Sequence, residues 1–239
     1  MKKKKKELNI YLLDKNRRRP SFKIRRFLSK ILIRKPKYKF TGEEFPDEPI
    51  VLLSNHVGKR APSKIELYYP REFRMWGTHE MTEGFSSVHK YLRTTYYHDK
   101  RHLPRFMAWI FATIATIFIN PLYRGMKIIP TYKDHRFITS LKLSFEAYQN
   151  KQDIIIFPED SSEGYKEQIT AFYAGFVSLL KNLFKKGFDV PVFIMYFQKK
   201  ANTFVVSHKI MFSEIAKKFN TIEEIANEFR IRMNALMNA

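Results

Sequence analysis

The stretch Ile-Val-Leu-Leu-Ser-Asn-His at residues 50–56 decides the predicted fold, together with Ile-Ile-Ile-Phe-Pro-Glu at residues 154–159. Each is a short apolar run that ends in polar side chains, which is typical of a buried strand followed by a functional loop. The carboxyl ends of successive strands in an α/β sheet lie at one edge, where such proteins bind ligands. We therefore expect the polar residues of both stretches to lie at one site.

Outward from these stretches, short apolar runs alternate with helical patterns along the chain. Strands are predicted at residues 50–53, 73–76, 126–129, 154–157, 190–196 and 204–206. Helices are predicted at residues 63–69, 105–119, 137–150, 169–184 and 221–237. The last helix begins with a capping box that Thr221 and Glu224 form. The alternation predicts an α/β fold with a mixed, largely parallel central sheet flanked by helices.

Length and charge limit the class of protein. The chain has 239 residues, of which 44% are hydrophobic, enough for one catalytic domain, which we place at residues 41–239. It carries 44 Lys and Arg against 23 Asp and Glu, so its formal charge of +21 draws it towards a polyanion, either nucleic acid or anionic lipid. The absence of cysteine excludes disulfides and thiolate chemistry. The lysine-rich start lacks the apolar core of a signal peptide, so we expect a protein at the cytoplasmic face of the membrane.

Residues 1–40 form a basic segment in which we predict an amphipathic helix. At helical spacing, one apolar face carries Ile24, Phe27, Leu28 and Ile31. This face excludes Phe22, Arg26 and Ser29. Such a helix lies in the interface of an anionic bilayer, and the alternative is a helix packed on the domain with a solvated basic face. Because a phosphate-binding stripe would not need the apolar face, we expect no nucleic-acid partner.

Residues 106–119 are apolar apart from two threonines, and Asn120 and Pro121 follow them. A helix of this length falls short of the roughly 20 residues that cross a bilayer. We expect a buried, re-entrant or interfacial helix, and a transmembrane span stays open as the alternative.

His56 is the candidate general base. It follows a predicted strand and precedes Gly58, and imidazole in such a loop can take a proton from a hydroxyl near neutral pH. The alternative is a histidine that is only hydrogen-bonded in the loop. Several cations near it in the predicted topology could hold a phosphate. They are Lys59, Arg60 and Lys64 in the same loop, and Arg124 and Lys133 around the next candidate strand.

The second stretch continues into a loop with three carboxylates, on Glu159, Asp160 and Glu163. Closely spaced carboxylates can bind hard cations, but the spacing matches no known cation-binding loop, so we predict no metal ion. Alternatively, Asp160 and Glu163 are ordinary charged residues at the start of a helix, without a role in binding.

These motifs resemble those of the glycerolipid acyltransferase family, whose best-known members are the 1-acylglycerol-3-phosphate O-acyltransferases. The pair Asn55 and His56 resembles the first motif, whose histidine deprotonates the acceptor hydroxyl for attack on an acyl thioester. Residues 125–133 resemble the second, with Lys133 where the family has a phosphate-binding arginine. Residues 190–192 resemble the fourth motif, a buried strand near the acyl donor.

The third motif is similar to Phe157, Pro158 and Glu159, and the family's glutamate contacts the acceptor. The aromatic-glycine stretch at residues 172–176 also fits the family order. The resemblance therefore implies a glycerol-3-phosphate acyltransferase-like fold and an O-acyltransferase without a bound cofactor. It implies an acyl-CoA or acyl carrier protein donor, a lysophospholipid acceptor such as 1-acylglycerol-3-phosphate, and an anionic membrane surface. The substrate-binding residues would be Asn55, Arg60, Arg124, Lys133, Phe157, Pro158 and Glu159.

The chain also departs from the family pattern. The first motif is a histidine, four residues and an aspartate that orients the imidazole, and here Ala61 stands in the place of that aspartate. We expect Glu66 to take over this role, with Glu80, Asp160 or a backbone carbonyl as alternatives. Asp160 replaces the glycine that usually follows the third-motif glutamate, and a lysine in place of the arginine loses bidentate geometry.

Three interpretations follow from the sequence. The first is a divergent acyltransferase with His56 and Glu66 as catalytic residues. The second is a lipid-binding protein of the same fold that has lost catalysis, as the missing aspartate would predict. The third is a nucleic-acid binder, which charge alone supports.

Overall fold

The computed structural model describes residues 20–58, 60–99, 101–160, 164 and 166–239. These residues divide into two compact units. The first comprises residues up to Ile33 together with Thr78–Ile128, and the second comprises Arg34–Gly77 together with Ile129–Ala239. The part of the predicted basic segment at residues 1–19 lies outside the described residues.

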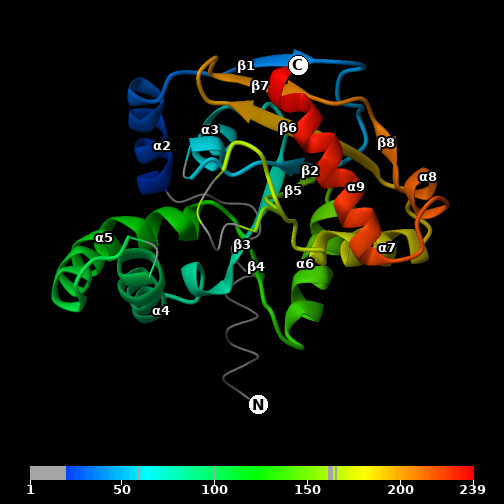
Figure 1. Ribbon diagram of the computed structural model, residues 1–239. Coiled ribbons are helices and arrows are strands. Elements are labelled where there is room, and N and C mark those ends of the chain that lie inside the picture. The colour runs from blue at the N-terminus through cyan, green and yellow to red at the C-terminus, as the bar shows by residue number, and fades with distance from the viewer. Residues whose placement is uncertain (1–19, 59, 100, 161–163, 165) are drawn as a thin grey trace. The chain divides into compact units, whose positions relative to one another are not determined.

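The second unit is built on an eight-stranded mixed sheet within the described part of the chain, in the order β1-β7-β6-β2-β5-β3-β4, with β8 paired to β6 (Figure 1). Its strands are β1 Lys37–Phe40, β2 Val51–Ser54, β3 Phe73–Thr78, β4 Ile129–Thr131, β5 Asp153–Ile156, β6 Pro191–Gln198, β7 Thr203–Val206 and β8 Ile210–Met211. Strands β6, β2, β5 and β3 run parallel to one another, whereas β7 and β8 are antiparallel to β6. The predicted α/β fold with a mixed, largely parallel sheet is confirmed.

Helices cover this sheet because its strands are apolar on both sides. The side chains of Val51, Ile154 and Val192 pack into one core with α6 Phe137–Gln149, α7 Gly175–Lys185 and α9 Ile222–Ala235. The helix α3 Arg60–Tyr68 directly follows the loop after β2. Two further short helices, α8 Phe212–Ala216 and the 3₁₀ helix η3 Leu236–Asn238, complete the carboxyl-terminal part. The capping box of Thr221 and Glu224 forms as predicted.

The first unit is helical. It contains α2 Pro20–Leu32, the 3₁₀ helix η1 His79–Met81, α4 Phe85–Tyr91, the π-helix η2 Leu92–Asp99 and α5 Arg105–Gly125. A small core of Met81, Val88, Leu92 and Ala112 joins its helices. No helix among the described residues is both long and apolar enough to cross a membrane.

Several predicted elements have different boundaries. The helix expected at residues 63–69 is α3, which begins at Arg60, so Arg60 and Lys64 lie on a helix and not in the loop where the sequence placed them. The strand expected at residues 126–129 begins only at Ile129, because Lys127 has a positive φ of 52° that no strand residue adopts. The helix expected at residues 169–184 begins at Gly175, because the segment before it is extended and pairs with the loop after β5. The helix expected at residues 105–119 continues to Gly125, against which the ring of Phe22 packs so closely that a Cβ would clash.

Candidate active site at the carboxyl edge of the sheet

The two stretches that decide the fold lie side by side. Val51 pairs with Ile154 and Leu53 with Ile156 in the parallel ladder of β2 and β5. The residues that follow the two strands are therefore neighbours. The backbone N–H of His56 donates a hydrogen bond of 3.0 Å to Oε2 of Glu159. The predicted base and the predicted acceptor-contacting carboxylate thus occupy one site.

His56 is held in a constrained loop. The edge of the Phe157 ring lies against its imidazole, with the ring centroids 5.0 Å apart, and its Nδ1 atom is buried. The next two residues, Val57 and Gly58, have φ values of 44° and 63°. A positive φ is rare for a β-branched residue such as valine, and strain of this kind is concentrated at functional sites. The loop therefore fixes the imidazole at a backbone cost.

Asn55 connects this loop to the neighbouring strand β6. Its Nδ2 donates to the carbonyl of Phe197 at 3.3 Å, and its Oδ1 accepts from the N–H of Phe197 at 2.6 Å. Both halves of the buried amide are thus engaged with the backbone of one residue, so Asn55 extends the β2–β6 pairing by a side chain. These hydrogen bonds fix the side chain of Asn55 next to His56, and its contact with substrate stays a prediction.

Glu159 is a buried carboxylate with an altered pKa. Its exposed fraction is only 8%. Burial raises its pKa, although hydrogen bonds from the backbone N–H groups of His56 and Lys166 act in the opposite direction. A carboxyl group with a shifted pKa at the end of a strand is a candidate functional residue, because burying a carboxyl away from water is unfavourable and is concentrated at functional sites.

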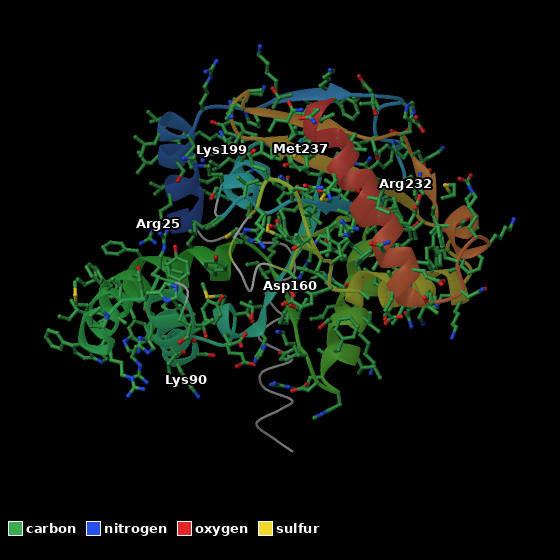
Figure 2. The ribbon with its side chains drawn as sticks, viewed as in Figure 1. Arg25, Lys90, Asp160, Lys199, Arg232 and Met237 are labelled. Carbon is green, nitrogen blue, oxygen red and sulfur yellow. The ribbon has the colours of Figure 1, made fainter. Side chains whose placement is uncertain are left out.

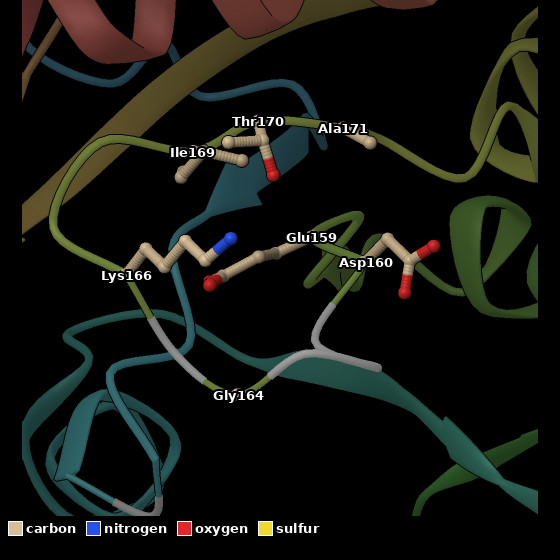
Figure 3. A pocket seen from close by; sticks show the side chains of 7 residues that line it. All are labelled: Glu159, Asp160, Gly164, Lys166, Ile169, Thr170 and Ala171. Carbon is tan, nitrogen blue, oxygen red and sulfur yellow. The ribbon is translucent and has the colours of Figure 1, made fainter.

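A cavity of about 270 Å³ lies beside Glu159. In Figure 3 the side chains of Glu159 and Lys166 extend into it from two sides, while the carboxylate of Asp160 points away. Its remaining described lining consists of Gly164, Ile169, Thr170 and Ala171. Residues 169–171 line the cavity because the chain segment at residues 169–173 runs back beside the loop after β5, where Glu159 and Phe172 form an antiparallel bridge. The cavity thus offers a carboxylate, an ammonium group and a hydroxyl to a polar ligand.

Lys133, the predicted phosphate-binding residue, lies next to Tyr173 of the segment at residues 169–173. Its Nζ is 5.3 Å from the centroid of the Tyr173 ring, and the hydroxyl of Tyr173 donates to Oδ1 of Asp160 at 2.8 Å. The sequence did not single out Tyr173 as a site residue. Its place in the aromatic-glycine stretch at residues 172–176 was the available signal. Lys133 and the carboxylate-bearing loop are thus joined through one tyrosine.

The helix α3 carries the remaining candidates of this unit. Arg60 is exposed at its first position, and Ala61 is fully buried in its first turn. Glu66 is buried one and a half turns further on, with 4% exposure. The predicted role of Glu66 in orienting the imidazole stays a prediction.

Arg124 belongs to the first unit, near the end of α5, whereas the other predicted site residues belong to the second. Its part in the site stays a prediction. Of the other predicted residues, His56, Phe157 and Glu159 are joined by direct contacts, Asn55 precedes His56, and Pro158 accepts a hydrogen bond from the N–H of Tyr173 at 2.7 Å.

Neither metal chemistry nor known relatives define the site further. In the described part of the chain, no group of three or more potential ligand side chains could hold a metal ion. Compared with models of protein families, the chain matches none, and it matches no curated protein. The site is therefore interpreted from its own geometry and chemistry.

Proposed function

We propose that the protein is an O-acyltransferase that moves a fatty acyl group from a thioester donor to the hydroxyl of a lysophospholipid at a membrane surface. The observation that carries this proposal is the hydrogen bond between His56 N–H and the Glu159 carboxylate. This bond joins a histidine and a buried carboxylate at one edge of the sheet. The two residues stand in sequence motifs whose order resembles that of the glycerolipid acyltransferases. The acceptor is proposed to be a phosphate-bearing lysophospholipid such as 1-acylglycerol-3-phosphate.

In the proposed reaction, the imidazole of His56 takes the proton of the acceptor hydroxyl, and the hydroxyl oxygen attacks the thioester carbonyl carbon. The carbon–sulfur bond then breaks, and the thiolate leaves with the proton that the imidazole returns. Because Nδ1 is buried, Nε2 is the nitrogen that would carry this proton. No external oxidant or cofactor is needed, since the thioester supplies the leaving group.

The other residues have roles in holding the acceptor. Glu159 lies beside the cavity and would accept a hydrogen bond from a glycerol hydroxyl. Lys133 supplies a positive charge for the phosphate, with Arg60 and Arg124 as further candidates. Lysine is a point charge on a flexible stem, so contact with Tyr173 would restrict it before the phosphate binds.

One observation favours a second candidate function. Ala61 is fully buried at the position where the family pattern has an aspartate, so the imidazole lacks that carboxylate. A lipid-binding protein that has lost catalysis would carry such a change. This alternative keeps the membrane and the lipid ligand but predicts no turnover.

The test is an acyl-transfer assay with wild-type protein and His56→Ala, using long-chain acyl-CoA and acyl carrier protein donors and lysophosphatidate in anionic vesicles. Wild type should form the diacyl product. His56→Ala should lose activity by a factor of about 10²–10⁴, because a general base contributes that much. Its circular dichroism and vesicle binding should match wild type, and equal turnover by both proteins would remove His56 from the mechanism. Vesicle binding without product from wild type, for every donor, would favour the second candidate.

A further inference from the structure

The helix α5 exposes a broad apolar face. Its outward side chains are large and hydrophobic, with exposed fractions between 42% and 73%. They are Phe106, Met107, Trp109, Phe111, Ile114, Ile117 and Phe118. The opposite side of the helix carries small buried residues, among them Ala108, Ala112 and Thr116. The large side chains thus remain exposed, although the rings of Trp109 and Phe111 also lie 6.5 Å from His89 and 5.9 Å from Tyr97 of the same unit, between ring centroids.

The polar side chains near this face either already form hydrogen bonds within the protein or are basic. The hydroxyl of Thr113 donates to the carbonyl of Trp109 at 2.9 Å and lies 3.0 Å from Nε2 of His89. The sequence contains no Asp or Glu between residues 100 and 133. The outward face of α5 therefore has no charge from residue 106 to residue 118 and offers few hydrogen bonds to a partner.

The neighbouring helix α2 presents the same character. It packs on α5 through its buried Phe22, which lies against Gly125, and Nη1 of Arg25 donates to the carbonyl of Phe118 at 3.2 Å. Figure 2 labels Arg25 on this helix. The apolar side chains of α2 are exposed by 53% to 85%. They are Ile24, Phe27, Leu28, Ile31 and Leu32.

Basic side chains lie beside the exposed residues of α2. Lys23, Arg25 and Lys30 are themselves exposed, and no acidic residue occurs between residues 15 and 42. An apolar face with a basic border and no acids is complementary to lipid acyl chains beneath anionic headgroups. A protein partner would fit less well, because protein interfaces carry about one hydrogen bond per 100–200 Å².

We propose that α5 lies in the interface of an anionic phospholipid bilayer with its outward side chains among the acyl chains, and that α2 lies beside it with its basic residues at the headgroups. The sequence predicted an interfacial position for the amino-terminal helix, and for residues 106–119 it left buried, re-entrant, interfacial and transmembrane positions open. The structure adds α5, on which seven large hydrophobic side chains are exposed against five on α2. This inference rests on the membrane-surface part of the proposed function and not on acyl transfer.

The chain's two tryptophans allow a direct test, because only one of them is on α5. Trp109 is exposed by 49%, whereas Trp76 donates to the hydroxyl of Ser144 at 2.9 Å in the other unit. The variants Trp76→Phe and Trp109→Phe each keep one tryptophan. Each is bound to vesicles of phosphatidylglycerol and phosphatidylcholine with brominated acyl chains. The fluorescence of Trp109 should shift to the blue and be quenched, and that of Trp76 should not be.

Two results would overturn the inference. One is unquenched Trp109 in protein that nevertheless sediments with the vesicles. The other is a blue shift of Trp109 that depends on protein concentration without lipid, since it would assign the apolar face to a second copy of the chain. Analytical ultracentrifugation of the same samples identifies the second case.

A matched pair of charge insertions measures the contribution of α5 to binding. Ile114 on α5 and Ile138 on α6 are exposed by 53% and 61%. Ile114→Asp should lower the vesicle partition coefficient about tenfold or more, because it removes an aliphatic side chain that the acyl chains would cover and adds an anion near anionic lipid. Ile138→Asp should leave it unchanged, and equal effects of both variants would contradict the proposal.

The test of membrane insertion by α5 can fail or succeed independently of the test of acyl transfer. His56→Ala should insert α5 as wild type does, so an inactive protein with quenched Trp109 would reject the chemistry and retain the membrane surface. Conversely, turnover on detergent-dispersed substrate with unquenched Trp109 would retain the chemistry and reject the insertion of α5.

Discussion

At the residue scale, Glu159 combines a functional position with a cost in stability. Burial raises its pKa above the ordinary value of 4.5, so the folded state binds a proton more tightly than the unfolded state. The stabilising contribution of the protonated form is complete below the ordinary pKa and is lost as the pH rises through the raised pKa. A neutral amide at this position does not suffer that loss.

We therefore predict that Glu159→Gln becomes more stable relative to wild type as the pH rises from below 4.5 through the raised pKa, and that the difference is constant above it. Urea unfolding at a series of pH values gives this difference in the free energy of unfolding. The exposed Glu44→Gln serves as the control for loss of one carboxylate. A difference for Glu159→Gln that does not change across this window would refute the assigned cause of the pKa shift.

At the scale of the elements, α3 decides whether the missing aspartate has been replaced. Glu66 is buried on this helix, and a carboxylate that orients the imidazole contributes to the rate and not to substrate affinity. Glu66→Gln should then lower kcat by up to about 10⁴-fold with little change in KM, by analogy with loss of the aspartate in a catalytic triad. Steady-state kinetics and thermal unfolding of the same preparation separate this from a structural role. A near-normal kcat with a lowered melting temperature would assign Glu66 to structure alone.

The elements that the sequence predicted well are those with strong local patterns. The runs before His56 and Glu159 are continuous apolar strands, and the capping box at Thr221 is a local motif, so both could be recognised without tertiary information. The general rule for α/β sheets predicted that both runs end at one edge of the sheet, whereas the direct pairing of β2 with β5 was not predicted.

The elements that were missed depend on distant contacts. The segment that pairs Phe172 with Glu159 lies in a stretch with a helical pattern, but its backbone hydrogen bonds go to distant residues, to Pro158 and Asp160 after β5. The last turn of α5 passes Pro121, where local preference predicts an end, and Phe22 packs on that turn from far along the chain. The hydrogen bonds of Asn55 to Phe197 likewise join residues that no sequence spacing relates.

At the scale of the whole molecule, we expect the effect of the +21 charge on membrane binding to depend on where the basic residues lie. Lys23 and Lys30 are exposed on α2 and border its apolar residues, whereas Lys199 and Lys200 are exposed after β6, in the other unit. Figure 2 labels Lys199. Replacing Lys23 and Lys30 by serine should weaken binding to anionic vesicles by roughly 30-fold, at about 1 kcal/mol for each lysine near the surface.

The matched control replaces Lys199 and Lys200 by serine, which removes the same charge from a different place. Vesicle sedimentation at low and high salt distinguishes the two variants, because the effect of Lys23 and Lys30 should diminish as salt screens it. Equal weakening by both variants would mean that net charge, and not the position of the basic residues, determines membrane binding.

The most direct test of the central claim is acceptor-dependent cleavage of the thioester. Release of free thiol from acyl-CoA or acyl carrier protein is followed with and without lysophosphatidate, and mass spectrometry identifies the acylated lipid. Wild type should release thiol only with acceptor present, in a one-to-one ratio with the new ester, and His56→Ala should release none. Thiol release that ignores the acceptor, or that His56→Ala retains, would contradict acyl transfer by this site.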